Sequence, residues 1–267
     1  MGAMAKIRID ILLVERGLAS SSSMARRLLM AGQVRVNGQL VLNAATSVDP
    51  AVALEVEKGP RFVSRGGEKL EAGLLAFKIG VTGLVCADVG ASTGGFTDCL
   101  LQYGAARVYA IDVGHGILDW KLRQDARVIV MEGTNARHID HLPEPVNLVT
   151  IDASFISLKV LVPVVRDWLS SPGEVIALIK PQFEAGRVEA ARARGVIRDP
   201  EIHRKVLEEV LAFSQQVGWE IRAVIRSPLL GPKGNAEFLA HLKVPSESER
   251  NIHEVIDGLI EPVGGPA

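Results

Sequence analysis

Four charged residues stand beside long apolar segments, at places where a folded chain would not leave a charge unpaired. Asp152 directly follows the apolar run 148–151, and Lys180 directly follows the run 175–179. Lys69 opens a predicted helix before the first apolar run, and Glu237 begins the last one. Buried charges need partners, and a cation lowers the pKa of a neighbouring acid by about 1–3 units. The four residues can therefore form one proton-handling cleft, with two surface ion pairs as the alternative interpretation.

A glycine-rich turn follows the first apolar run, in the order Asp88-Val89-Gly90-Ala91-Ser92-Thr93-Gly94-Gly95-Phe96-Thr97. Its spacing is neither G-x-G-x-x-G nor that of a phosphate loop, which argues against NAD and ATP. A strand that ends in Asp-x-Gly and a turn of small residues suits S-adenosylmethionine (SAM), whose methionine end is a zwitterion. Asp112 ends the second run, where an acid holds ribose hydroxyls, and Asn135 follows the third, where an adenine edge is read.

The predicted cofactor site therefore gathers residues from the turn and from three later strand ends. A tight packing turn and a surface aspartate are the alternative interpretation of the same segment. The predicted contacts are Asp88, Gly90, Ser92, Thr93, Gly94, Gly95, Phe96, Asp112, Asn135 and Asp152.

Apolar runs of strand length alternate with segments that can hold a helix. The runs cover residues 84–89, 107–113, 128–131, 148–151 and 175–179. This alternation is typical of a parallel sheet covered by helices on both faces. After a predicted helix over 203–217, the runs 221–225 and 237–242 flank a loop rich in proline and glycine, which predicts an antiparallel pair. The fold class is therefore α/β, with a Rossmann-like, mostly parallel seven-stranded sheet and an antiparallel last strand.

The first 58 residues form a small α+β module of different charge. Residues 1–65 hold nine Lys/Arg against five Asp/Glu, whereas the remainder holds 21 against 26. A serine cluster at 20–23 can cap a helix, and Asn37-Gly38 predicts a tight turn between strands. A basic module ahead of an acidic body is one way to bind RNA without a high pI. We expect a linker over 59–64, a catalytic domain over 65–244, and a tail over 245–267 with one possible short helix at 252–260.

Arginines are the expected RNA contacts, because bonds to phosphates position an RNA without reading its sequence. The stretch 187–204, with Arg192 and Arg194, can form a lip over the substrate or a solvated helical face. Aromatic residues make up 4% of the chain, so stacking on bases cannot be extensive, although Phe155 or Phe183 can flank a target base or pack in the core. The predicted RNA contacts are Arg26, Arg27, Arg35, Arg61, Arg65 and Arg198.

The composition excludes several other classes of protein. The chain has 267 residues, 48% of them hydrophobic, and a net charge of −1, which excludes a disordered chain. No apolar run approaches the ~18–20 residues of a membrane span, and the first residues lack the apolar core of a signal peptide. Cys86 and Cys99 are expected as core residues, and no histidine cluster indicates a metal. We expect a cytoplasmic protein without a metal or an obligate protein partner.

Six segments together resemble the TlyA (hemolysin A-like) family of ribosomal RNA 2′-O-methyltransferases, whose catalytic domain is similar to FtsJ. Residues 7–56 resemble the RNA-binding domain named after the fourth small-subunit ribosomal protein. That domain usually has Ser-Arg before its second helix, but this chain has Ser21-Ser22, so the arginine expected for one RNA contact is missing. The six segments are the glycine turn, Ser64-Arg65-Gly66-Gly67-Glu68-Lys69-Leu70, Asp152-Ala153-Ser154-Phe155-Ile156-Ser157-Leu158, Lys180-Pro181-Gln182-Phe183-Glu184, Gly195-Val196-Ile197-Arg198-Asp199 and Gly234-Asn235-Ala236-Glu237-Phe238.

The resemblance implies methyl transfer from SAM to a ribose 2′-hydroxyl, that of a cytidine, in ribosomal RNA of the small or the large subunit. The family's Lys-Asp-Lys-Glu tetrad falls on Lys69, Asp152, Lys180 and Glu237. It implies that Lys180 stands beside the attacking oxygen and is oriented by Asp152. Lys69 then adds positive charge, and Glu237 orients Lys69 or the ribose. Whether Lys180 is a base or an electrostatic element stays open.

Three competing hypotheses remain. The chain could be a ribosome-binding assembly factor without methylation activity, although all four tetrad residues are present. It could be a membrane-acting hemolysin, which the absence of an apolar span argues against. It could methylate a small molecule, but this hypothesis does not explain the basic module at residues 1–58.

Overall fold

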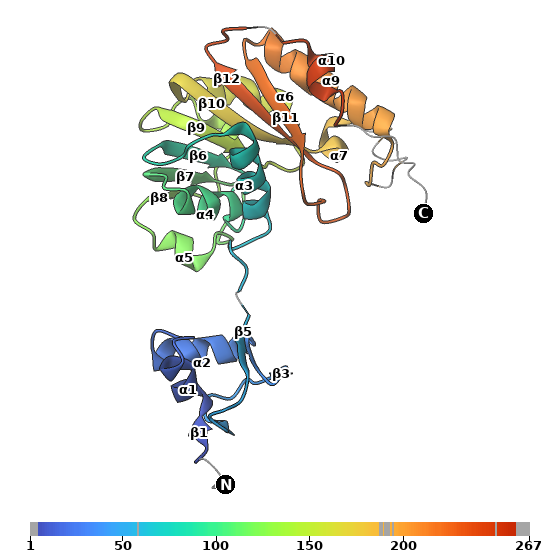
Figure 1. Cartoon of the computed structure of the whole chain (residues 1–267). Helices are drawn as coiled ribbons and strands as arrows, with labels where there is room; N and C mark the ends of the chain where they lie inside the picture. The colour runs from blue at the N-terminus through green and yellow to red at the C-terminus, as the bar shows by residue number, and fades with distance from the viewer. Residues whose placement is uncertain are drawn as a thin grey trace. The chain divides into compact units, whose positions relative to one another are not determined.

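The computed structural model describes residues 5–57, 59–186, 189, 193, 195–248 and 250–259. The chain forms two compact units, residues 1–61 and 62–267, and the division falls within the segment 59–64. Figure 1 shows the helices and strands of both units, which are described separately here.

The smaller unit packs two helices against short antiparallel strands. Ser21 accepts a hydrogen bond from the Met24 amide and caps the second helix, as its serine cluster predicts. Asn37 and Gly38 are both left-handed, with φ of 47° and 79°, and form the predicted tight turn. The helices are α1 (Ile9–Glu15) and α2 (Ser22–Met30), and the strand pairs are β1 (Ile7–Arg8) with β4 (Ser47–Val48) and β2 (Val34–Val36) with both β3 (Gln39–Leu40) and β5 (Leu54–Val56).

The larger unit is built on one seven-stranded sheet, with strand order β11-β12-β10-β9-β6-β7-β8. β12 runs antiparallel to both of its neighbours, and the other pairs are parallel, which confirms the predicted sheet. The order reverses between β6 and β9, and ligands of such sheets bind outside the carboxyl ends of strands at that point. The strands are β6 (Val85–Val89), β7 (Arg107–Ile111), β8 (Val128–Met131), β9 (Val146–Ile151), β10 (Leu169–Ile179), β11 (Glu220–Arg226) and β12 (Phe238–Val244).

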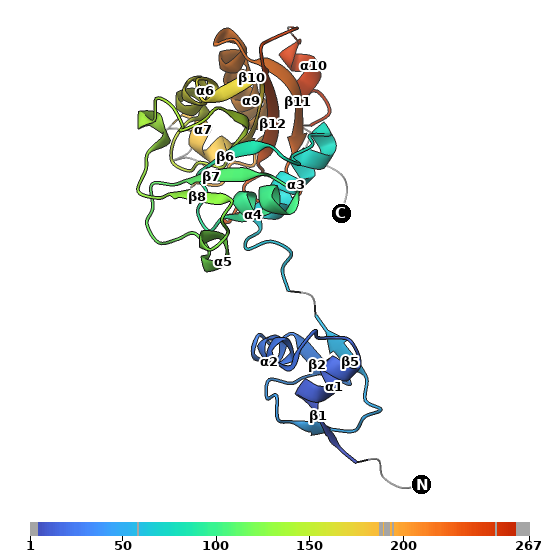
Figure 2. The same ribbon diagram turned by 90° about the vertical axis from the view of Figure 1, so that its left-hand side faces the viewer.

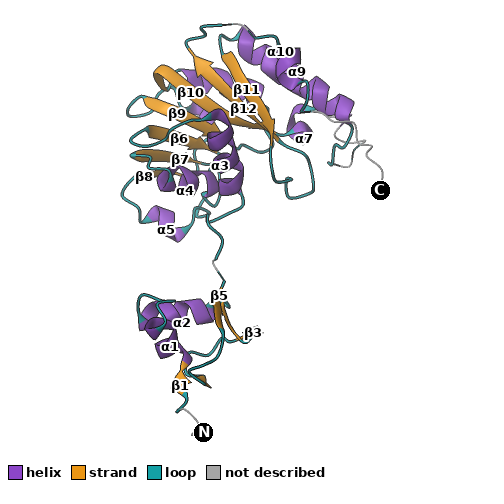
Figure 3. Cartoon of the chain, viewed as in Figure 1, coloured by secondary structure: helices purple, strands orange, loops and turns teal. Residues whose placement is uncertain are grey.

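Helices cover both faces of this sheet, as Figures 2 and 3 show. Alternate strand residues therefore enter different cores: Leu148 packs with α3 and α4, whereas Val149 packs with α6 and α9. Cys86 and Cys99 are fully buried in the first of these cores. The helices are α3 (Gly66–Phe77), α4 (Gly95–Gln102), α5 (Trp120–Arg123), the 3₁₀ turn η1 (Ala136–His138), α6 (Leu158–Arg166), α7 (Pro181–Glu184), α9 (Pro200–Gln216) and α10 (Ile252–Ile256).

Two helices differ from their predicted bounds. α9 begins three residues before the predicted start, because Asp199 accepts a hydrogen bond from the Glu201 amide and Pro200 occupies the first helical position. α10 ends at Ile256, and residue 260 of the predicted helix lies outside the described residues. Among the helices that the structure describes, none is long and apolar enough to cross a membrane.

Candidate active site

The four predicted catalytic residues come from four elements and meet in one cavity of about 530 Å³. Asp152 follows β9, Lys180 follows β10, Glu237 precedes β12, and Lys69 lies on α3. Lys69 Nζ lies 2.5 Å from Glu237 Oε2, and both side chains are buried. Lys180 Nζ lies 2.6 Å from Asp152 Oδ1. The set is thus two ion pairs, but both line one cavity instead of the surface.

The Lys180 ammonium is surrounded by acceptors. It donates hydrogen bonds to the Asp152 carbonyl, at 3.2 Å, and to Ser154 Oγ, at 3.0 Å. Asp152 Oδ1 lies at ion-pair distance from Lys180 Nζ, but the two atoms do not have the geometry of a hydrogen bond. Two hydrogen bonds and one ion pair therefore surround the Lys180 side-chain nitrogen with oxygen atoms. Sequence reasoning named the motif that contains Ser154 but gave this residue no role.

The segment between Asp152 and α6 is held by Glu184. Its carboxylate accepts hydrogen bonds from the Leu158 amide, at 2.7 Å, and from Ser157 Oγ, at 2.6 Å. Burial raises the pKa of Glu184, while these two donors lower it. Phe155, in the same segment, has φ of +62° and a side chain 90% exposed, and its ring lies 4.9 Å from the Phe183 ring. An exposed aromatic residue in a left-handed conformation marks this segment as a candidate contact surface.

The glycine turn lies against the Asp152 segment. Gly90 has φ of +84°, and a Cβ there would lie 2.9 Å from the Asp152 carbonyl carbon and oxygen. Gly94, at φ +96°, faces Leu122 across a contact that leaves no room for a Cβ. Five of the seven predicted turn residues line a cavity of about 400 Å³, namely Gly90, Ser92, Thr93, Gly95 and Phe96.

Asp88 and Gly94 are the two predicted turn residues that line none of the cavities described here. Asp88 is fully buried beneath the turn, where it accepts hydrogen bonds from Thr97, at 2.7 Å, and Thr150, at 3.1 Å. Burial raises the pKa of Asp88 to about 7, against the opposing effect of the two hydroxyl donors. Asp88 therefore stabilises the glycine turn through buried hydrogen bonds and does not line the predicted cofactor site.

Asp112 and Asn135 line a second cavity, of about 440 Å³, together with the apolar side chains of Val113 and Ile117. One Asp112 oxygen accepts from the Ser92 amide, at 2.8 Å, and the other accepts from the Gly114 amide, at 2.7 Å. Asp112 therefore joins the glycine turn to the segment after β7. Each carboxylate oxygen keeps a lone pair for a further donor.

A carboxylate that sequence reasoning missed shapes this second cavity. Glu132 accepts hydrogen bonds from the amides of Gly116, Ile117 and Leu118, at 2.8–3.0 Å, and also pairs with Arg123. The Arg123 contact and these amides lower the pKa of Glu132 to about 2. Glu132 thus fixes the main chain that carries Ile117. Its role could not be predicted, because every residue except proline has an amide and a carboxylate that binds amides leaves no pattern in the sequence.

The three cavities share Gly90, Ser92 and Asp152 in their walls. Their residues fit SAM: an acid and an amide beside apolar side chains suit an adenosine, and a turn rich in amides suits a zwitterion. The tetrad cavity lies next to them and is open to a second reactant. No group of three His, Cys, Asp or Glu within the described ranges is arranged to hold a metal ion.

The predicted RNA contacts belong to both units and are described here unit by unit. In the smaller unit, Arg26 lies 3.3 Å from Asp10 and Arg35 lies 2.5 Å from Glu57, while Arg27 is exposed on α2. In the larger unit, Arg65 donates to the Leu230 carbonyl, and Arg198 is exposed. Arg61 has interactions within the protein, and Arg192 and Arg194 lie outside the described residues. RNA binding by these residues stays a prediction.

Models of two known families match the chain. A model described as FtsJ-like methyltransferase matches residues 62–244, and a model described as S4 domain matches residues 7–52. The two matches fall on the larger and the smaller unit, respectively.

Relatives and a solved structure match nearly the full chain. The 16S/23S rRNA (cytidine-2′-O)-methyltransferase TlyA of Mycobacterium tuberculosis is 42% identical over 246 residues, which are 91% of each chain. Hemolysin A of Brachyspira hyodysenteriae is 40% identical over 242 residues, 88% of this chain and 99% of the relative. A structure described as a hemolysin from Streptococcus thermophilus is 42% identical, with a TM-score of 0.70 over 95% of both chains.

Proposed function

The chain belongs to the TlyA (hemolysin A-like) family, and from this premise we propose that it transfers a methyl group from SAM to a cytidine ribose 2′-hydroxyl of ribosomal RNA. The FtsJ-like unit would hold SAM and the target ribose. The S4 unit would bind the RNA, or a ribosomal subunit that contains it. We place this activity in the cytoplasm.

One observation supports this proposal best: two lysines and two carboxylates line a single cavity beside the glycine turn. The tetrad cavity shares Gly90, Ser92 and Asp152 with the two cavities that fit SAM. A reactant in the tetrad cavity would therefore lie next to the cofactor, with Lys180 at its wall.

When bound, SAM supplies a methyl group on a positively charged sulfur. The protein's first task is to hold a hydroxyl in line with that group, and positioning of this kind contributes about 7–11 kcal/mol. Its second task is to make the hydroxyl more acidic, and a neighbouring cation lowers such a pKa by about 1–3 units. Lys180 suits the second task. Of the three oxygen atoms around it, that of Ser154 belongs to a neutral, exposed side chain that an incoming hydroxyl can replace.

We assign Lys180 an electrostatic role in this reaction. Lys180 pairs with the Asp152 carboxylate at 2.6 Å, and an ion pair uses the ammonium form, whereas a general base must be neutral. Lys69 adds a second positive charge, balanced by Glu237, at the same cavity. The proton of the hydroxyl would then leave to water. A single-turnover rate that rises and levels off between pH 6 and 9 would indicate a neutral lysine and contradict this assignment.

The test is methyl transfer from labelled SAM to ribosomal RNA from cells that lack the enzyme. RNA of each subunit is offered both naked and in assembled subunits, and the label is identified after digestion to nucleosides. Lys180→Met should lower the rate by about 10²–10³-fold, the usual loss when one donor that stabilises a reacting oxygen is removed. Lys205→Met, on the exposed face of α9, is the matched control and should keep the wild-type rate.

The result also separates the competing hypotheses. Label in 2′-O-methylcytidine, lost in Lys180→Met, would establish the reaction and the subunit. Measurable SAM binding without label on any RNA would refute the proposal and favour an assembly factor. The Brachyspira relative is named a hemolysin, which suggests membrane damage as a competing hypothesis. Leakage of dye-loaded liposomes tests this hypothesis directly.

A further inference from the structure

We propose that Arg65 is a positioning residue that latches the β11–β12 loop, residues 227–237, over the two reactant cavities. The inference rests on the proposed function, because it gives the loop a task in methyl transfer. It also replaces the predicted role of Arg65 as a contact for RNA phosphates.

The latch is one hydrogen bond between distant parts of the larger unit. Arg65 immediately precedes α3, and its Nη2 donates to the Leu230 carbonyl at 2.7 Å. Because the acceptor is a main-chain oxygen, the bond fixes the loop backbone whatever side chain stands at position 230. The guanidinium is thus directed at the loop.

The tip of the loop has few other attachments. Its remaining hydrogen bonds are local. The Gly231 amide donates to the Asn235 carbonyl, the Gly234 amide donates to the Gly231 carbonyl, and the Ser227 hydroxyl bonds to the amide and the carbonyl of Leu229. The base of the loop is held separately, because Asn235 bonds to the Ile197 amide and the Gly195 carbonyl. Among the hydrogen bonds of the described residues, the bond from Arg65 is the one that joins residues 228–234 to another element.

The same loop touches the tetrad. Gly231 lies so close to the Glu237 carboxylate that a Cβ at this position would overlap Glu237 Oε1. The loop backbone therefore shields the carboxylate that pairs with Lys69 at 2.5 Å. If the tip moved away, water would reach this buried pair and weaken its electrostatic effect.

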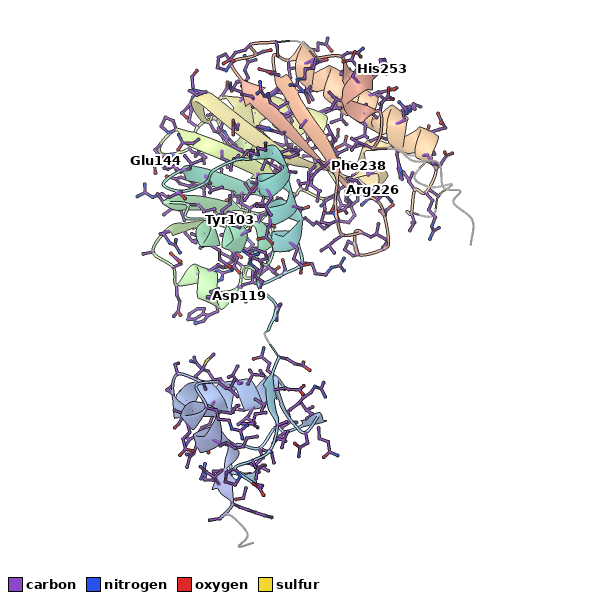
Figure 4. The ribbon with its side chains drawn as sticks, in the orientation of Figure 1. Tyr103, Asp119, Glu144, Arg226, Phe238 and His253 are labelled. Atoms are coloured by element: carbon purple, nitrogen blue, oxygen red, sulfur yellow. The ribbon has the colours of Figure 1, made fainter. Side chains whose placement is uncertain are left out.

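The loop is also part of both cavity walls. Leu230 and Pro232 line the cavity of the glycine turn together with Arg65. Pro232 and Lys233 line the tetrad cavity. Figure 4 labels Arg226 and Phe238, paired residues from which the loop departs and to which it returns. A latched tip therefore confines both the cofactor and the acceptor, and an unlatched tip opens both cavities together.

A latch and a phosphate contact predict different results for Arg65→Ala. Loss of a latch should weaken SAM affinity and lower kcat by roughly 3- to 10-fold each, the effect of one ordinary hydrogen bond. RNA affinity and its dependence on salt should stay unchanged. Loss of a phosphate contact should instead weaken RNA binding and reduce the slope of log affinity against log salt by about 0.7–0.9.

The experiment compares wild type, Arg65→Ala, Arg65→Lys and Arg166→Ala. Arg166 is a matched control, because it also donates to a main-chain carbonyl, that of Val217, away from the three cavities. SAM affinity is measured by calorimetry, methylation by steady-state rates, and RNA affinity by filter binding across a salt series. Arg65→Lys should recover part of the loss, because an ammonium can donate to one carbonyl, and Arg166→Ala should match wild type.

Hydrogen exchange of the amides in residues 228–234 tests the latch without reference to methylation. These amides should exchange faster in Arg65→Ala than in wild type, while those of the α3 interior should not change. Unchanged exchange, or an altered RNA salt slope with normal SAM affinity, would overturn the inference. A wild-type protein that neither binds SAM nor methylates RNA would instead refute the proposed function, and the exchange result would still decide whether the latch exists.

Discussion

Asp88 gives the stability of the larger unit a pH dependence that can be measured. Its side chain is fully buried at the end of β6, and burial raises its pKa from the usual 3.8 to about 7. Asp88→Asn removes the titration but keeps the size and polarity of the side chain. An amide can still bond to the hydroxyls of Thr97 and Thr150, because each hydroxyl can donate or accept.

The pKa fixes both the sign and the size of the effect. Because the folded-state pKa is raised, the neutral carboxyl stabilises the fold fully below about pH 3.8, and this contribution is lost as the pH rises through about 7. One pKa unit corresponds to about 1.4 kcal/mol, so the ionised carboxylate costs on the order of 4 kcal/mol above pH 7. Between pH 5 and pH 8, the free energy of unfolding of Asp88→Asn should therefore rise by about 2–3 kcal/mol relative to wild type.

Urea unfolding, followed by tryptophan fluorescence at pH 5 and pH 8, measures this difference. The chain has three tryptophans, Trp120, Trp168 and Trp219, and all lie in residues 62–267, so the signal reports on the larger unit. Asp167→Asn, at an exposed position, controls for the loss of a charge. A difference between Asp88→Asn and wild type that is the same at both pH values would refute the reasoning, because Asp88 would then not titrate in this range.

Three further substitutions test other parts of the site. Glu237→Ala leaves Lys69 buried without its partner, so the free energy of unfolding should fall by about 3–5 kcal/mol in the same urea assay. Gly90→Ala places a Cβ 2.9 Å from the Asp152 backbone at φ +84°, and calorimetry should show SAM binding lost although the protein stays folded by circular dichroism. Phe155→Gly relieves a left-handed conformation, so thermal unfolding should show a protein stabilised by about 1 kcal/mol, while RNA affinity in filter binding falls.

The sequence predicted those parts of the site that depend on local patterns. Asp152 and Lys180 end apolar strands, and strand ends meet at one edge of a parallel sheet, so their convergence follows from the pattern alone. Asp88 shows the limit of this logic. It belongs to the same strand end as Gly90, but its side chain points to the buried side of the turn, toward Thr97 and Thr150. A strand pattern places a residue along the chain, and the pleat decides which side it faces.

Side chains that bind main-chain groups could not be predicted. Glu132 binds three consecutive amides, Glu184 caps α6, and Arg65 binds the Leu230 carbonyl. Amides and carbonyls are present at nearly every residue, so their partners leave no spacing or composition to detect. Such contacts form only in the completed fold. They hold three segments that line the candidate site, namely 116–118, 152–158 and the β11–β12 loop.

The two ion pairs of the tetrad differ in a way that suits different tasks. Lys69 and Glu237 are both nearly inaccessible, so each is the partner that the other's buried charge needs. Lys180 is equally buried, but Asp152 is 22% exposed, and the neighbouring Ser154 is open to the cavity. A reactant can therefore replace a neutral contact of Lys180 without separating a buried pair of charges. This difference makes Lys180 the lysine that can approach a substrate hydroxyl, while Lys69 supplies a fixed charge behind it.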